Sequence, residues 1–108
     1  MPKGLIVLTP FPFTDLSGHK VRPALVLYNQ KGGEDCIVSF ISSHAKKRTS
    51  AYDIPVFPTD LNGIKVNSII KIDKIATLQK RIILGELGML ELPLLKEVNT
   101  RLKNLFKI

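Results

Sequence analysis

Short apolar runs separated by turn residues fill the first three quarters of the chain, and this pattern constrains the fold most strongly. The runs are four to eight residues long, which is the usual length of a β-strand. Pro55 interrupts the fourth run, and Pro23 is the second residue of the second run. Because a proline has no N–H to donate to a sheet ladder, each is expected at a strand start or on an edge. The six runs cover residues 4–9, 22–28, 35–42, 52–57, 68–72 and 81–84.

The period of the apolar residues changes after Leu92. Leu95, Val98, Leu102 and Leu105 follow one another at the spacing of a helix, with basic residues off that stripe. We therefore predict a single domain over residues 1–108 with a mostly β (α+β) fold. It would be a small barrel of about six strands with an amphipathic C-terminal helix packed on it.

The charge balance favours an anionic partner. The 108 residues include 16 Lys and Arg against 9 Asp and Glu, a net charge of +7, and much of this excess lies in residues 44–81. A positive field of this size suits nucleic acid or an acidic protein. Cys36 is the only cysteine, which excludes an internal disulfide and fits a reducing compartment. With no apolar run near 18 residues, we expect a cytoplasmic protein without a membrane segment.

The sequence carries none of the common catalytic motifs. It lacks GxxxxGK[ST], GxGxxG, GxSxG and HExxH, and with two histidines and one cysteine a catalytic zinc site is not expected. Cationic and hydroxyl side chains beside strand ends remain. Arg22 opens the second strand, and Ser42 ends the third. Lys71 and Asp73 alternate, which predicts that they share one face of their strand. Cations can hold a phosphodiester while a carboxylate acts as a base, although each of these residues also fits an ordinary solvated surface.

One stretch resembles a known family. Gly4–Val7 followed by FPFTDLSGHKVRPALVL resembles the opening of the MazF/PemK toxin family, and VSFIS, SIIKIDKIATL and the C-terminal helix extend the resemblance along almost the whole chain. It implies an SH3-like barrel that forms a homodimer. It also implies an endoribonuclease of a type II toxin–antitoxin system, held in check by a cognate acidic antitoxin. Such an enzyme needs no metal or cofactor, because the 2′-OH of single-stranded RNA is the nucleophile.

The resemblance also assigns roles to residues. Arg22 matches the arginine of the Arg-Pro motif, and Ser42 stands where the family usually has threonine. Lys71 and Asp73 stand where some members have a second catalytic arginine and a carboxylate base. These four are the predicted catalytic residues, with no metal ligand among them. The predicted RNA-binding residues are Lys20, Ser43, His44, Lys46, Lys47, Arg48 and Asn67.

Departures from the family pattern keep two alternatives open. Lys71 replaces arginine, which removes a bidentate phosphate contact. No acidic or histidine helper aligns in the loop before Arg22, where Asp15 and His19 are the candidate substitutes. One alternative is a non-enzymatic, CcdB-like inhibitor of DNA gyrase that acts through its C-terminal residues. The other is a barrel that binds RNA without cutting it.

Overall fold

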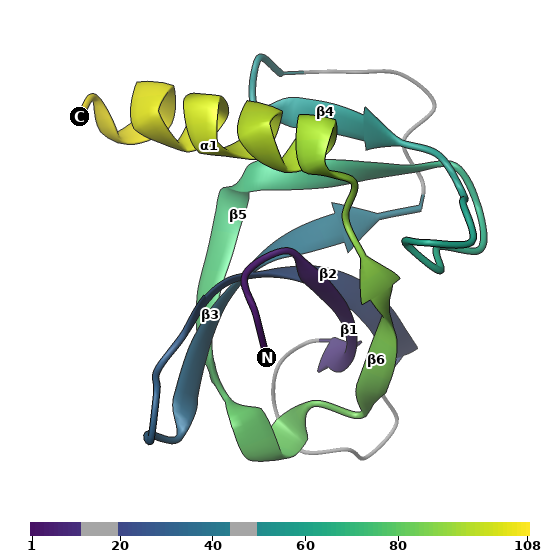
Figure 1. Ribbon diagram of the computed structural model, residues 1–108, viewed down its shortest axis with the longest axis vertical. Coiled ribbons are helices and arrows are strands. Elements are labelled where there is room, and N and C mark those ends of the chain that lie inside the picture. Colours follow the sequence, from purple (N-terminus) through teal and green to yellow (C-terminus); the bar gives the residue numbers. More distant parts are fainter. Residues whose placement is uncertain (12–19, 44–49) are drawn as a thin grey trace.

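The computed structural model describes residues 1–11, 20–43 and 50–108, which form a curled antiparallel sheet and one helix (Figure 1). The helix α1 lies across one end of the curled sheet (Figure 1). The predicted mostly β fold with a C-terminal helix is confirmed. The elements in chain order are β1 (Leu5–Phe11), β2 (Lys20–Asn29), β3 (Asp35–Ser42), β4 (Asp53–Val56), β5 (Ser68–Gln79), the 3₁₀ turn η1 (Lys80–Ile82), β6 (Gly85–Met89) and α1 (Leu92–Phe106).

The strand order is β4-β5-β3-β2-β1-β6, so β4 and β6 form the edges of the sheet. Pro55 thus lies on an edge strand, as predicted. Pro23 is instead the fourth residue of β2, an interior strand, and pairs with Leu8 of β1, so its expected place at a strand start or on an edge is wrong. The ladder between β2 and β3 runs from Asn29↔Cys36 only as far as Ala24↔Phe40, so Pro23 lies beyond its end. At that position the missing N–H removes no bond to β3.

The two faces of the sheet bury two separate apolar clusters, because successive strand residues point to opposite sides. The helix face carries Ile6, Leu25, Ile41 and Ile70 and is covered by α1 through Val98, which is fully buried. This confirms that the apolar stripe of the helix is core. The opposite face, called here the barrel face, lines the inside of the curled sheet. Its cluster consists of Leu5, Val7, Ala24, Val26, Cys36, Val38 and Leu78.

The prediction of a strand at residues 81–84 is wrong. Residues 80–82 form η1, and the strand follows at Gly85–Met89. The reason is that β5 loses its partner strand here: β5 pairs with β3 up to Asp35↔Gln79, where the ladder ends. There the N–H of Lys80 donates to the carbonyl of Glu34 at 2.7 Å. The two isoleucines at 82 and 83 then pack against the barrel-face cluster, so their apolar character serves burial rather than pairing.

The strand expected at residues 68–72 extends to Gln79, and it is irregular in its middle. Ser39 of β3 pairs with Ile75, whereas the next residue, Phe40, pairs with Lys71. Residues 72–74 therefore have no partner on β3. Because β5 carries these extra residues, it bends along its length (Figure 1). Lys71 lies just before this irregular stretch and pairs with β3 on one side and with β4 on the other.

Candidate functional site

A buried carboxylate and a lysine form an ion pair on the two neighbouring strands β4 and β5. Asp53 and Lys71 are directly opposite each other in the ladder, and Lys71 Nζ lies 3.1 Å from Asp53 Oδ2. The side chain of Asp53 is 1% exposed, whereas that of Lys71 is 26% exposed. The ammonium group of Lys71 is thus partly accessible at the surface, whereas the carboxylate of Asp53 is not.

Side-chain and backbone hydrogen bonds fix the main chain around this pair. The hydroxyl of Ser39, itself fully buried, donates to the carbonyl of Lys71 at 2.5 Å. The N–H of Ile72 donates to the carbonyl of Tyr52 at 2.9 Å. The hydroxyl of Ser50 accepts from the N–H of Tyr52 at 3.0 Å, which closes the turn before β4. Lys71 is therefore held from β3 on one side and from the entry of β4 on the other.

Arg22 lies on the same face of the sheet as Lys71. Across β2 and β3, Ala24 pairs with Phe40, and across β3 and β5, Phe40 pairs with Lys71. Paired residues of an antiparallel sheet point to one side, so this row belongs to the barrel face that Ala24 helps to line. Arg22 stands two residues before Ala24 and shares its side.

Ser42 belongs to the same face, because it stands two residues after Phe40 at the end of β3. Continuing the β2–β3 register by two residues brings Ser42 opposite Arg22. Both side chains are half-buried. The hydroxyl of Thr9 on β1 donates to the carbonyl of Arg22 at 3.2 Å and fixes the strand at that point. Three of the four predicted catalytic residues thus lie on one face of three adjacent strands.

Asp73 is exposed and lies in the stretch of β5 that has no partner on β3. The β3–β5 register therefore does not place Asp73 in the row of Lys71, Phe40 and Ala24, and its place on the face of Lys71 stays a prediction. In the described part of the chain the carboxylate that pairs with Lys71 is Asp53.

The remaining predicted residues divide into two groups. Lys20 begins β2, Ser43 follows β3 and Asn67 precedes β5, and all three are exposed. The candidates His44, Lys46, Lys47, Arg48, Asp15 and His19 lie outside the described residues.

Comparison with known proteins decides the family. A model of the PemK-like, MazF-like toxins of type II toxin–antitoxin systems matches residues 3–106. The chain belongs to the PemK/MazF toxin family. Comparison with curated protein sequences gives no match.

Solved structures of MazF toxins share the fold of this PemK/MazF chain. A mycobacterial endoribonuclease in complex with its cognate antitoxin superposes with a TM-score of 0.76 at 20% identity, covering 100% of this chain and 97% of that one. The Mycobacterium tuberculosis toxin MazF-mt6 gives 0.76 at 20% identity over 96% and 97%. The MazE–MazF structure from Deinococcus radiodurans gives 0.77 at 22% identity over 100% and 97%. At such identities the likeness concerns the fold.

Asp53 is the residue of this MazF-like site that sequence analysis missed. It precedes Ile54 and Pro55 in a run that reads only as a weak edge strand. The pairing with Lys71 spans 18 residues of chain and is set by the β4–β5 register. The one available signal was a charged residue at the start of a short apolar strand. This signal does not identify the residue with which Asp53 pairs.

A second polar cluster lies away from these residues, where the segment after β4 meets the start of α1. Asn62 is fully buried, and its Oδ1 accepts from the N–H groups of Thr59 and Ile64 at 3.1 and 2.9 Å. Its Nδ2 donates to the carbonyl of Phe57 at 2.9 Å and to Glu91 Oε1 at 3.2 Å. Thr59 donates its hydroxyl to the other oxygen of Glu91. This group of Thr59, Asn62 and Glu91 is called here the loop clamp.

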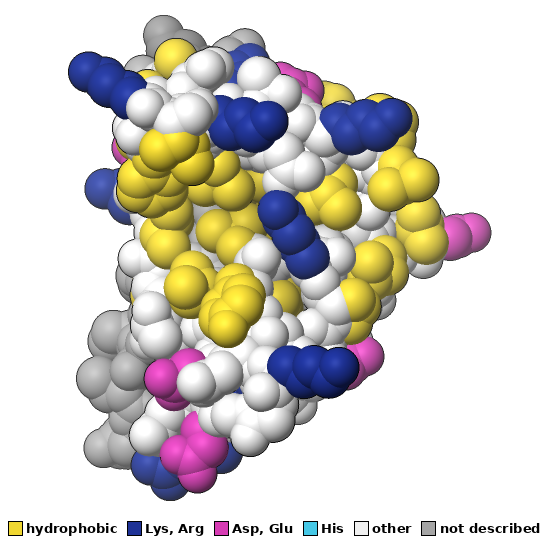
Figure 2. All heavy atoms as spheres, turned by 60° about the vertical axis from the view of Figure 1, so that its left-hand side comes forward, with side chains coloured by type: hydrophobic (Ala, Val, Ile, Leu, Met, Phe, Trp, Pro, Cys, Tyr) yellow, Lys and Arg dark blue, Asp and Glu magenta, His cyan; other side chains and the backbone are white. Residues whose placement is uncertain are grey.

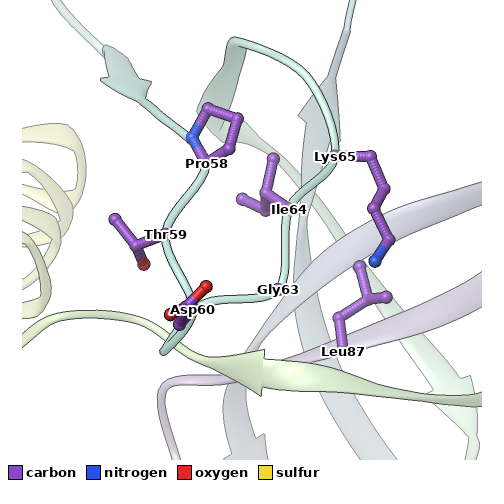
Figure 3. A pocket seen from close by; sticks show the side chains of 7 residues that line it. All are labelled: Pro58, Thr59, Asp60, Gly63, Ile64, Lys65 and Leu87. Atoms are coloured by element: carbon purple, nitrogen blue, oxygen red, sulfur yellow. The ribbon is translucent and has the colours of Figure 1, made fainter.

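The loop clamp borders a hollow of about 410 Å³ (Figure 3). Gly63 comes within reach of β6 there: with φ +69°, a Cβ on it would meet the carbonyl oxygen of Leu87 at 2.2 Å. The close approach therefore requires glycine. The residues that line the hollow are Pro58, Thr59, Asp60, Gly63, Ile64, Lys65 and Leu87.

The described residues hold no group of three or more His, Cys, Asp or Glu side chains placed to bind a metal ion. Cys36 is fully buried in the barrel-face cluster, and this burial raises the pKa of its thiol, as expected for a cysteine that acts as a small apolar side chain. In the described part of the chain, no helix is both long and apolar enough to cross a membrane.

Proposed function

We propose that this toxin is a metal-independent endoribonuclease that cuts single-stranded RNA with the RNA 2′-OH as nucleophile. The observation that carries the proposal is the placement of Arg22, Ser42 and Lys71 on one face of neighbouring strands in a chain of the PemK/MazF family. Two cations and a hydroxyl on one face of three adjacent strands suit a phosphodiester, since the positive charge stabilises the extra negative charge of the transition state.

The reaction needs a base, an acid and phosphate-binding cations from the protein. A base removes the proton from the 2′-OH, whose oxygen attacks the phosphorus and forms a 2′,3′-cyclic phosphate. An acid donates a proton to the departing 5′ oxygen, which leaves as a 5′-OH. Arg22 and Lys71 hold the phosphate oxygens, and Arg22 is also the candidate acid that gives the 5′ oxygen its proton. Ser42 donates a hydrogen bond to a phosphate oxygen or to the 2′ oxygen. Asp73 is exposed and is the candidate base.

Charge and exposure support RNA as the ligand. Lys20, Ser43 and Asn67 are exposed and stand at strand ends that border the site, and the chain carries a net charge of +7. Contacts from these residues to phosphates or bases would extend the site along a single strand. The candidates at 44–48, which lie outside the described residues, keep their proposed role in RNA binding.

Exposed apolar surface supports the protein partners of the proposal, which are a second copy of the chain and an acidic antitoxin. Hydrophobic side chains gather on the face shown in Figure 2, with Lys and Arg side chains beside and among them. An apolar patch rimmed by charge is typical of a protein–protein interface, and its positive charge would suit an acidic partner. The related mycobacterial structure is a complex of an endoribonuclease with its cognate antitoxin. We place the action in the cytoplasm.

Cleavage of a long single-stranded RNA by the purified chain in EDTA tests the proposal. We expect cuts at a short repeated sequence that leave cyclic phosphate and 5′-OH ends. Arg22→Ala should lower the rate at least about 100-fold, because it removes a cation that acts on the transition state. Binding of RNA without new ends would instead establish the non-cutting barrel. Growth inhibition that survives Arg22→Ala but is lost on changing the C-terminal residues would establish a gyrase-type toxin.

A further inference from the structure

We infer that Asp53 is a positioning residue, which holds the ammonium group of Lys71 in place for the bound phosphate. This role rests on the proposed function. The two residues face each other across β4 and β5 with Nζ and Oδ2 3.1 Å apart. Asp53 is too deeply buried to touch RNA itself, so the role inferred for it acts through Lys71.

The anion is itself fixed. The N–H of Asp53 donates to the carbonyl of Ser50 at 3.2 Å, and the guanidinium of Arg101 on α1 donates to the carbonyl of Ala51. The start of β4 is thus tied both to its own turn and to the helix. A carboxylate on such a segment provides a stationary counter-charge for a side chain with four flexible bonds.

The ion pair is the one charged pair of the β4–β5 ladder. The next pair, Ile54 and Ile70, points to the opposite face and packs in the helix-face core. Replacing a largely buried ion pair with apolar residues is commonly neutral or stabilising. Stability alone therefore does not explain the ion pair. An ammonium group held in a fixed direction on the same face as Arg22 does explain it.

The identity of the cation strengthens this reasoning. Lysine is a point charge on a flexible stem and lacks the planar fork with which arginine orients itself on a phosphate. An anchored carboxylate removes most of that freedom before RNA binds, so less conformational entropy is lost in the transition state. Asp53 therefore supplies the orientation that lysine at position 71 lacks.

Steady-state cleavage of an RNA oligonucleotide that contains one mapped cut site tests the role. Four proteins are compared: wild type, Asp53→Asn, Lys71→Met and the double variant. We expect Asp53→Asn to lower kcat about tenfold or more and to change KM less than about twofold, since a misdirected group costs rate rather than binding. In the Lys71→Met background, Asp53→Asn should lower kcat no further.

Glu91→Gln is the matched control. It also removes a charged carboxylate that is held by side-chain hydrogen bonds, but in the loop clamp, away from Lys71 and from the segment that holds Asp53. Its kcat should equal that of the wild type. Asp53→Glu keeps the charge and should recover part of the rate. If Asp53→Asn does not fold, Asp53→Glu with and without Lys71→Met provides the same comparison.

The role is overturned if folded Asp53→Asn cuts at the wild-type rate. It is equally overturned if the substitution lowers kcat by the same factor with and without Lys71, because the effect then does not pass through the lysine. Wild-type kcat in Lys71→Met also overturns it. A wild-type chain that binds the oligonucleotide and makes no cut refutes the proposed function itself, and this role with it.

Discussion

The barrel-face group around Asp53 and Lys71 and the loop clamp around Asn62 and Glu91 each bury a polar side chain, but they satisfy it differently. The buried carboxylate of Asp53 pairs with a lysine that extends to the surface. The buried amide of Asn62 has both of its N–H bonds and both lone pairs of its oxygen engaged, by Phe57, Glu91, Thr59 and Ile64. The first arrangement presents a cation outward, and the second presents none.

This difference separates a group suited to binding from one suited to holding a loop. A fully satisfied polar network fixes a unique backbone conformation, and the charge that the loop clamp carries, on Glu91, is negative and does not attract a phosphate. A paired cation at the surface retains a field that a phosphate can feel. The variants below test whether the two groups differ in this way, beginning with the largest expected effect.

Removing only the cation should damage both activity and stability. Lys71→Met leaves the buried charge of Asp53 without its lysine and should cost about 2–3 kcal/mol of unfolding free energy, somewhat below a fully buried pair because Lys71 is partly exposed. Cleavage should fall about 100-fold. Urea unfolding and RNA cleavage measure the two effects.

The apolar double variant Lys71→Met with Asp53→Leu sharpens this test. It should recover most of the lost stability and none of the lost activity, because neither of the two paired positions then carries a charge. Recovery of cleavage in this variant would show that the pair is structural.

Asn62→Ala should affect stability alone. It leaves the N–H groups of Thr59 and Ile64 and the carbonyl of Phe57 without their bonds, which should cost about 2–4 kcal/mol. The folded fraction should cut RNA at the wild-type rate. A tenfold loss of kcat at full folding would contradict the division between the two groups.

Glu91→Gln should give the smallest effect, and it should depend on pH. Partial burial raises the pKa of the Glu91 carboxyl, but hydrogen bonds from Thr59, its own N–H and Asn62 outweigh this and lower the pKa below 4.5. Because the folded-state pKa is lowered, the ionised carboxylate stabilises the fold above about pH 4.5, and this stabilisation is lost as pH falls through the folded-state value.

Thermal unfolding of the wild type and Glu91→Gln between pH 3 and pH 7 measures this. Near neutral pH the variant should be less stable by about 1 kcal/mol. The two melting temperatures should approach each other as the pH drops below 4.5. A gap that stays constant with pH would show that the hydrogen bonds of Glu91 do not depend on its charge.

Local sequence patterns determined most of the elements of this protein. Alternating and apolar runs located five of the six strands, the proline at 55 placed its strand on an edge, and the 3.6-residue spacing after Leu92 located the helix. These signals are local, since strand and helix periods are properties of neighbouring residues. The Arg-Pro stretch with the runs that follow it also led to the family that the full-length match confirms.

The partners of each polar side chain were decided only by the tertiary structure. Arg81–Leu84 has the composition of a strand, yet the ladder of β3 ends before it and the chain turns through η1. Asp73 is the local neighbour of Lys71, but the bend in β5 and the register with β4 give the lysine Asp53 instead. Strand register depends on which segments meet across the sheet, and no spacing along one segment contains that information.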